Sequence, residues 1–251
     1  MKADPCDHLV QAYTDDAFLV GIVGEYVAAG LDGGEAVILI ATPAHLDALQ
    51  ARLAAEGIGV AARRETGQLR CLDASRTLAA FMVDGSPDRS AFRGVIVAAL
   101  DHARTAGHRR IRCFGEMVDL LWKDNLPAAI ELEALWNELL GDQRVSLLCG
   151  YRLDPLDGRV RGVLHQVSRC HSRVLPVEEA ESIADALDRA WEDVFGVPGD
   201  AVMLRRLVVA DRAGLPRAQA TIFALHELSP LLADQVLERG RHYFRSGRLS
   251  A

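Results

Sequence analysis

The chain has 251 residues and a formal net charge of -7, with half of its residues hydrophobic and a quarter charged. This composition supports a full hydrophobic core beneath a polar surface and excludes a disordered or fibrous protein. The longest apolar runs, AVILIA and GVIVAAL, are far below the roughly 20 residues of a membrane span. Because no charged-apolar-small leader opens the chain either, we expect a cytoplasmic protein that makes no membrane contact.

Short apolar runs alternate with helical patterns through most of the chain. Strands are expected at residues 8–13, 36–41, 69–74, 110–117 and 145–151. Helices are expected at 17–31, 43–57, 89–107 and 127–141, with a helical region that includes 77–85 and a helix directly after Glu116. This alternation, with near-continuous apolar strands, predicts an α/β fold with a mostly parallel sheet and helices on both faces.

The strand signal fades after the fifth strand. A helix is predicted at about 178–195, and the next residues, 195–200, hold two glycines and a proline that indicate a hinge. Three helices are expected beyond the hinge, at 201–215, 216–228 and 229–247. We therefore divide the chain into an α/β domain at 1–175 and an α-helical extension at 176–251.

Polar residues follow each predicted strand. The carboxyl ends of parallel strands meet at one edge of a sheet, where open α/β folds bind ligands. We therefore predict a crevice that holds a small molecule. Its candidate ligand-binding residues are Tyr13, Thr14, Asp15, Thr42, Asp73, Glu116 and Tyr151. Each of these residues taken singly is also typical of a turn or a helix cap, so it is their clustering that indicates a site.

Glu116 ends the fourth predicted strand and has two possible roles. In a crevice, it accepts a hydrogen bond from a ligand or, with its pKa raised by burial, acts as a general base. At the start of a helix it simply caps the first turn. The residues around it do not decide between these roles.

Histidine and cysteine pairs raise the question of a metal site. His8 follows Cys6 closely and Cys170 is adjacent to His171, and zinc binds both thiolate and imidazole. The spacing is unfavourable, because adjacent residues rarely hold one ion together and the sequence has no CxxC or HxxxH pattern. We expect no metal ligands and no cofactor, reduced cysteines, and a hydrogen-bonded, partly buried His8.

The last 52 residues, 200–251, hold eight Arg and five acidic residues, a balance of +3. The pattern ADRAGLPRAQATIFAL is typical of a helix-turn-helix with Gly214 at its turn. Candidate phosphate contacts are Arg205, Arg206, Arg212 and Arg217. Few base-reading side chains accompany them, so we favour dimerisation or partner docking over DNA binding. The apolar helix faces need a cover, and we expect a symmetric homodimer to provide it.

The first 175 residues or so resemble the MEDS sensory domain, a family named for methanogens, methylotrophs and the dichloromethane regulator. The resemblance rests on residues 8–46 and on the segments DASRTLAAFMVDGSPDRSAF, FGEMVDLLW, IELEALWNELL and LLCGY, in that order. GLDGGEAVILIAT is also similar to ATPases of the RecA and circadian-clock KaiC type. The resemblance implies a RecA-like sheet that has lost its nucleotide-binding loop and serves bacterial signalling as a detector of small hydrocarbon derivatives.

The residues themselves agree with loss of that loop. A phosphate-binding loop needs the pattern GxxxxGK[ST], which the sequence lacks, and its only lysines are Lys2 and Lys123. We therefore expect no nucleotide hydrolysis. We interpret the chain as a ligand-responsive sensory or signalling regulatory protein without catalysis, whose output passes through a protein partner or a homodimer. Two alternatives stay open: a transcription regulator that uses the basic tail, and an enzyme with Glu116 as base.

Overall fold

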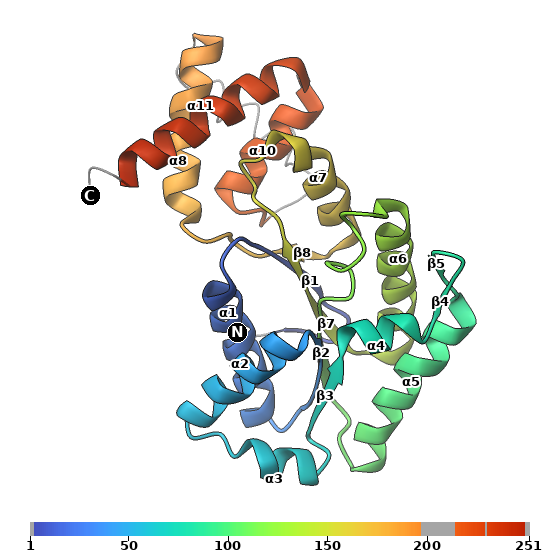
Figure 1. The fold of residues 1–251 in the computed structure, drawn as a ribbon. Helices are drawn as coiled ribbons and strands as arrows, with labels where there is room; N and C mark the ends of the chain where they lie inside the picture. The colour runs from blue at the N-terminus through green and yellow to red at the C-terminus, as the bar shows by residue number, and fades with distance from the viewer. Residues whose placement is uncertain (1–2, 197–213, 229, 249–251) are drawn as a thin grey trace. The chain divides into compact units, whose positions relative to one another are not determined.

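A computed structural model describes residues 3–196, 214–228 and 230–248. Its main sheet has six strands in the order β3-β2-β6-β7-β1-β8 (Figure 1). These strands are β1 (His8–Tyr13), β2 (Ala36–Ala41), β3 (Leu69–Asp73), β6 (Ile111–Gly115), β7 (Ser146–Arg152) and β8 (Arg173–Val174). All five strands expected from the sequence are present, and the predicted α/β fold class is confirmed.

The neighbouring strands β3, β2, β6 and β7 pair in parallel. Their register sets Ala41 opposite Asp73, Ile40 opposite Gly115, and Gly115 opposite Cys149. These four strands therefore end at one edge of the sheet, as their sequence order predicts. Every residue of β2 and β6 is buried, because helices cover both faces of a parallel sheet, and this explains the unbroken apolar runs.

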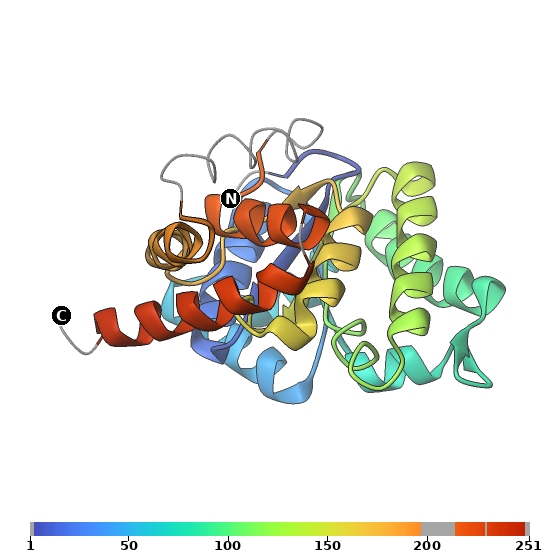
Figure 2. The same cartoon turned by 90° about the horizontal axis from the view of Figure 1, so that it is seen from above.

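Helices lie on both sides of this sheet. Figures 1 and 2 show α1 and α2 on one side and α5 and α6 on the other. The bounds of the helices that alternate with these strands are α1 (Asp16–Asp32), α2 (Pro43–Ala55), α3 (Val60–Glu65), α4 (Ala74–Ala79), α5 (Arg89–Thr105) and α6 (Leu126–Gln143). Helix α3 was not predicted, because it has neither a capping side chain nor a buried residue that would mark it in the sequence.

The prediction of a helix is wrong for two segments. Residues 117–124, after β6, form successive turns, and α6 begins only at Leu126. The delay has a local cause: Asn125 caps α6 by accepting a hydrogen bond from the Ala128 N–H at 3.1 Å, and a proline occupies the first turn. In the region 77–85 the helix α4 stops at Ala79, and the short hairpin of β4 (Met82–Val83) and β5 (Ser86–Pro87) follows it.

The chain divides into two compact units that interleave along the sequence. The first unit comprises residues 1–11, 15–151 and 170–172, and the second comprises 12–14, 152–169 and 173–251. The division predicted at residue 175 stays a prediction. None of the described helices is long and apolar enough to cross a membrane.

Helices form most of the described second unit. They are η1 (Gly158–Val160), α7 (Arg161–Cys170), α8 (Ala180–Phe195), α10 (Arg217–Leu228) and α11 (Pro230–Arg248). Helices α8, α10 and α11 contact one another around buried Leu187, Trp191 and Leu225. The helices predicted at 178–195, 216–228 and 229–247 are confirmed by α8, α10 and α11, whereas the one predicted at 201–215 falls mainly outside the described residues.

Candidate functional site

Glu116 lies directly beyond β6, at the edge where the parallel strands end. Its backbone N–H donates to the Ile40 carbonyl at 3.0 Å, which holds the residue beside β2. The residue is 2% exposed. Thr42 donates to its carboxylate through both the backbone N–H and the side-chain hydroxyl, each at 3.4 Å. Glu116 is therefore a buried carboxylate that neighbouring donors hold in place, and it does not cap a helix of its own.

His45 completes this group. Thr42 caps α2, and the helix presents His45 one turn later, with Nδ1 2.8 Å from the Glu116 Oε2. The other ring nitrogen, Nε2, lies 3.2 Å from the Asp16 carboxylate. The hydrogen bond with Glu116 raises the pKa of His45 and outweighs burial, which lowers it. Carboxylates on both sides of the ring thus favour its charged form relative to an isolated histidine.

The other residues predicted for the ligand site make different contacts. Asp15 and Asp73 accept hydrogen bonds from the first turns of α1 and α4, so both are helix caps. The phenol of Tyr151 donates to Glu133 at 2.6 Å. Tyr13 and Thr14 belong to the second unit. Among the seven residues, Thr42 and Glu116 are hydrogen-bonded to each other.

Tyr13 and Thr14 line a cavity of about 220 Å³ that lies within the second unit. Leu156, Ile183 and Phe244 contribute apolar side chains to its wall, and α11 adds Arg241 and Arg245. The remaining lining residues are Ala12, Asp154, Pro155, Val177, Glu178 and Glu179. The cavity thus combines apolar surface with charges of both signs.

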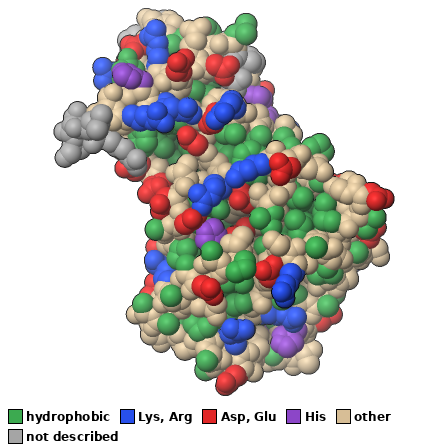
Figure 3. Space-filling view, in the orientation of Figure 1, with side chains coloured by type: hydrophobic (Ala, Val, Ile, Leu, Met, Phe, Trp, Pro, Cys, Tyr) green, Lys and Arg blue, Asp and Glu red, His purple; other side chains and the backbone are tan. Residues whose placement is uncertain are grey.

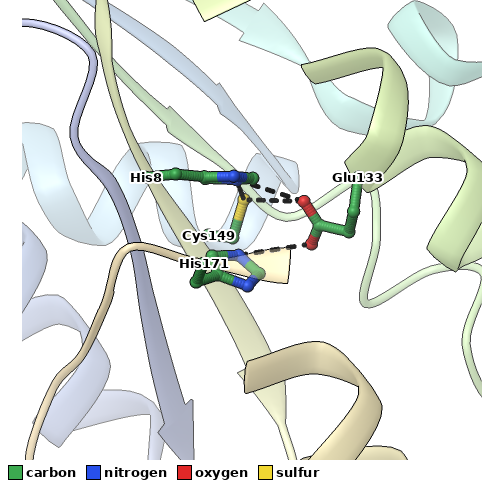
Figure 4. A group of neighbouring side chains, drawn as sticks. All are labelled: His8, Glu133, Cys149 and His171. Carbon is green, nitrogen blue, oxygen red and sulfur yellow. Dashed lines mark hydrogen bonds and ion pairs between the residues drawn. The ribbon is translucent and has the colours of Figure 1, made fainter. Parts of the chain in front are cut away.

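A second polar group is buried inside the first unit. It consists of His8 on β1, Glu133 on α6, Cys149 on β7 and His171, which directly follows α7 (Figure 4). Their potential ligand atoms all lie within 4.8 Å of one another. His8 Nε2 is 3.1 Å from Glu133 Oε2 and 3.4 Å from Cys149 Sγ, and His171 Nε2 is 3.5 Å from Glu133 Oε1. We call these four residues the buried cluster.

Neighbouring charges shift the pKa values of the acidic groups in the buried cluster. Burial alone would raise the pKa of Glu133, but the positive charge of His171 and the hydrogen bond from His8 outweigh it and lower the pKa to about 2. Burial raises the pKa of the Cys149 thiol, and the Glu133 charge raises it further. Glu133 is thus ionised in the core and compensated by at least one neighbouring positive charge.

Sequence reasoning missed Glu133, Cys149 and His45. Glu133 lies on the buried face of α6 beside Leu132 and Trp136, and an acid at a position where helical periodicity expects an apolar residue was the available signal. Cys149 had no such signal, because a thiol in a core strand is ordinary. His8 was expected to be partly buried and hydrogen-bonded; it is 2% exposed and bonds Asn137.

The basic tail offers little evidence of a nucleic-acid surface. Arg205, Arg206 and Arg212 lie outside the described residues. Arg217 donates to Asp185 and lies 3.4 Å from Glu181, so its guanidinium is already engaged by carboxylates of the α8 region. Figure 3 shows acidic and basic side chains interspersed on the visible face of the molecule. Such mixing gives no continuous positive surface there for phosphates.

Comparison with known proteins supports the interpretation as a sensory domain. No curated protein matches the chain. The family model described as "MEDS: MEthanogen/methylotroph, DcmR Sensory domain" matches residues 7–172, which is more than half of the 251 residues. The matched span contains β1 to β7, the His45–Glu116 group and all four residues of the buried cluster. The chain therefore belongs to the MEDS family of sensory domains.

Proposed function

We propose that this protein is a ligand-responsive signalling regulator, without catalysis of its own, that binds a small hydrocarbon derivative. The observation that carries the proposal is the second-unit cavity, in which the carboxyl end of β1 meets the C-terminal helix α11. Tyr13 and Thr14 line the cavity from the strand end, and Arg241 and Arg245 line it from the helix. Membership of a sensory family agrees with such a role.

Size and lining favour a small, partly apolar ligand. Drug-sized ligands occupy pockets of roughly 300–1,000 Å³, whereas this cavity has about 220 Å³. The guanidinium of Arg241 donates to the Leu156 carbonyl at 2.6 Å, while its buried Nε has no hydrogen-bond partner among the described residues. A ligand with a short carbon chain and one acceptor group, such as a carboxylate, would fill the apolar part and satisfy this donor.

The mechanism is a shift between conformational populations. Residues next to the start of α8, Glu178 and Glu179, share the cavity wall with α11. A ligand that prefers one arrangement of these helices stabilises that arrangement. The output then passes to a protein partner or to a second copy of the chain. Glu116 supports a role without catalysis, because His45 and Thr42 already occupy its carboxylate.

Titration calorimetry with short-chain carboxylates, alcohols and alkyl halides tests the proposal. A member of this panel should bind, and at a hundredfold excess over its Kd it should stabilise the protein by about 2.7 kcal/mol. Arg241→Gln should weaken binding of the best carboxylate by tenfold or more. Arg239→Gln is the matched control, because Arg239 lies on the same helix and does not line the cavity.

Two results would count against the proposal. One is the absence of binding heat and of thermal stabilisation across the whole panel. The other is an affinity that Arg241→Gln leaves unchanged, since the ligand would then bind elsewhere. Light scattering with and without the ligand reports whether the output is self-association.

A further inference from the structure

The buried cluster has the geometry of a four-ligand metal site. Bonds of about 2.0–2.3 Å from zinc to nitrogen, oxygen and sulfur place the ligand atoms of a tetrahedron roughly 3.3–3.6 Å apart. Four of the six separations within the cluster are 3.1 Å for His8–Glu133, 3.4 Å for His8–Cys149, 3.5 Å for His171–Glu133 and 3.8 Å for Cys149–Glu133, and the potential ligand atoms all lie within 4.8 Å of one another. These values bracket the tetrahedral range, and the four side chains converge on one point in Figure 4.

Neighbouring hydrogen bonds determine which nitrogen of His8 faces this point. The Asn137 amide donates from Nδ2 to the Cys170 carbonyl at 2.8 Å. Its oxygen therefore faces His8 and accepts from Nδ1 at 2.9 Å. A histidine that donates from Nδ1 presents Nε2 to the cluster, and this arrangement is the usual support for a metal-binding histidine.

The facing atoms require a positive charge between them. His8 Nε2 and the Glu133 carboxylate are 3.1 Å apart in a region where both residues are at most 2% exposed. Two lone pairs at this distance repel each other unless a proton or a metal ion lies between them. A proton on Nε2 satisfies only the contact it points along, whereas one cation at the centre satisfies all four ligand atoms.

Outer contacts complete the arrangement. The Tyr151 hydroxyl donates to Glu133 Oε1 at 2.6 Å and so fixes the orientation of the carboxylate. Ser172 donates to the His8 carbonyl at 3.1 Å and accepts from the His8 N–H at 2.9 Å, which joins the His171 segment to β1. Two imidazoles, a carboxylate and a thiolate suit a borderline-soft divalent ion, and the two anionic ligands neutralise its charge.

We propose that His8, Glu133, Cys149 and His171 bind one zinc ion as a closed, tetrahedral structural site. The ion links β1, β7, α6 and the segment after α7, elements that are distant in sequence. Coordination at Cys149 releases the thiol proton to solvent and forms the Zn–S bond without any redox change. This site is separate from the proposed ligand cavity, so either proposal can fail without the other.

The test is metal analysis of the untagged, full-length protein by plasma mass spectrometry. We expect about one zinc per chain after exhaustive dialysis. Protein stripped with a chelator should regain one equivalent of Zn²⁺, and with Co²⁺ it should show the visible absorption of a tetrahedral site together with a thiolate charge-transfer band. Removal of zinc should lower the thermal unfolding temperature, because metal binding contributes to folding free energy.

Variants identify the ligands. Cys149→Ser should abolish the charge-transfer band, and Glu133→Gln should reduce metal affinity at least tenfold. Cys113→Ser is the matched control, because Cys113 is an equally buried thiol on the neighbouring strand outside the cluster. Wild-type protein that neither holds a stoichiometric metal nor takes up Zn²⁺ or Co²⁺ would overturn the proposal. A Co²⁺ spectrum that Cys113→Ser removes and Cys149→Ser preserves would also overturn it.

Discussion

Protonation of His45 makes the charge at the sheet edge depend on pH. Its ring lies between the carboxylates of Glu116 and Asp16, and Asp119 also favours its positive charge. The hydrogen bond to Glu116 raises the pKa of His45 in the folded state. A folded pKa above the unfolded value means that this group stabilises the fold below the ordinary pKa of histidine. The contribution is lost as pH rises through the folded pKa.

The substitution His45→Gln tests this linkage, because glutamine keeps hydrogen-bonding groups but carries no charge. At about pH 6 the variant should lose roughly 1.5 kcal/mol, the lower end for a hydrogen bond to a charged group in a partly exposed setting. At about pH 9 the loss should be clearly smaller. Urea unfolding at both pH values measures it, with the exposed His102→Gln as control. A loss that is equal at both pH values, or larger at high pH, contradicts the linkage.

At the scale of single elements, the hairpin of β4 and β5 depends on its turn. Asp84 and Gly85 have φ angles of 49° and 84°. Two successive positive φ values are typical of a type I′ turn, for which Asp-Gly is a preferred pair. The Gly85 carbonyl also accepts a hydrogen bond from Asn125 Nδ2 at 2.8 Å, so the turn contacts the start of α6.

Gly85→Ala should therefore destabilise the protein by about 1–2 kcal/mol, because a β-carbon is strained at positive φ. Gly94→Ala is the matched control: Gly94 is an exposed position inside α5, and an added β-carbon meets nothing within 4 Å. The same change there should stabilise by roughly 0.5–1 kcal/mol. Chemical denaturation of both variants checks the opposite signs. Two effects of the same sign would show that backbone conformation does not decide the outcome.

The residues after β6 show a limit of pattern reasoning at this scale. Apolar spacing in MVDLLW favours a helix, yet residues 117–124 form turns. Met117 and Val118 are buried next to the sheet edge, whereas Lys123 and Asp124 are exposed. Helical propensity over one short segment is weak, and burial of the first residues together with the strong Asn125 cap overrides it.

At the scale of the whole molecule, most of the large apolar side chains in the described part of α10 and α11 are buried. Self-association was expected because its apolar helix faces need a cover, but Ile222, Phe223, Leu225, Val236 and Leu237 are already buried within the chain. Leu231 is 86% exposed. Because the five residues are already buried, the main physical reason for a homodimer through this surface is removed. The homodimer stays a prediction.

The division into two units predicts that a destabilising substitution in one unit leaves the stability of the other unit unchanged. Helix α11 crosses α8 at Gly240, where an added β-carbon would lie 2.9 Å from Leu187 Cδ2. Gly240→Leu should cost about 1–3 kcal/mol through overpacking. Hydrogen exchange should accelerate in α8, α10 and α11 and stay unchanged in β2 and β6. Gly247→Leu on the same helix, where nothing lies within 4 Å, is the control; exchange that accelerates equally in both units contradicts the division.

The sequence by itself determined the fold class, the order of the strands along the chain and the edge at which they end. These properties follow from local periodicity and from the rule that parallel strands need crossover helices. It also indicated helix caps near the strand ends, since Asp15, Thr42 and Asp73 each accept a hydrogen bond from the first turn of the helix that follows.

Only the tertiary structure decided which polar groups meet. Glu133, Cys149 and His171 come from three separate segments and join His8 in the core, while Tyr13 and Thr14 line the cavity together with α11. No spacing rule links such residues, because their proximity depends on how the helices cover the sheet. The physical reason is that sequence periodicity reports which face of an element is buried, whereas long-range packing decides what that face contacts.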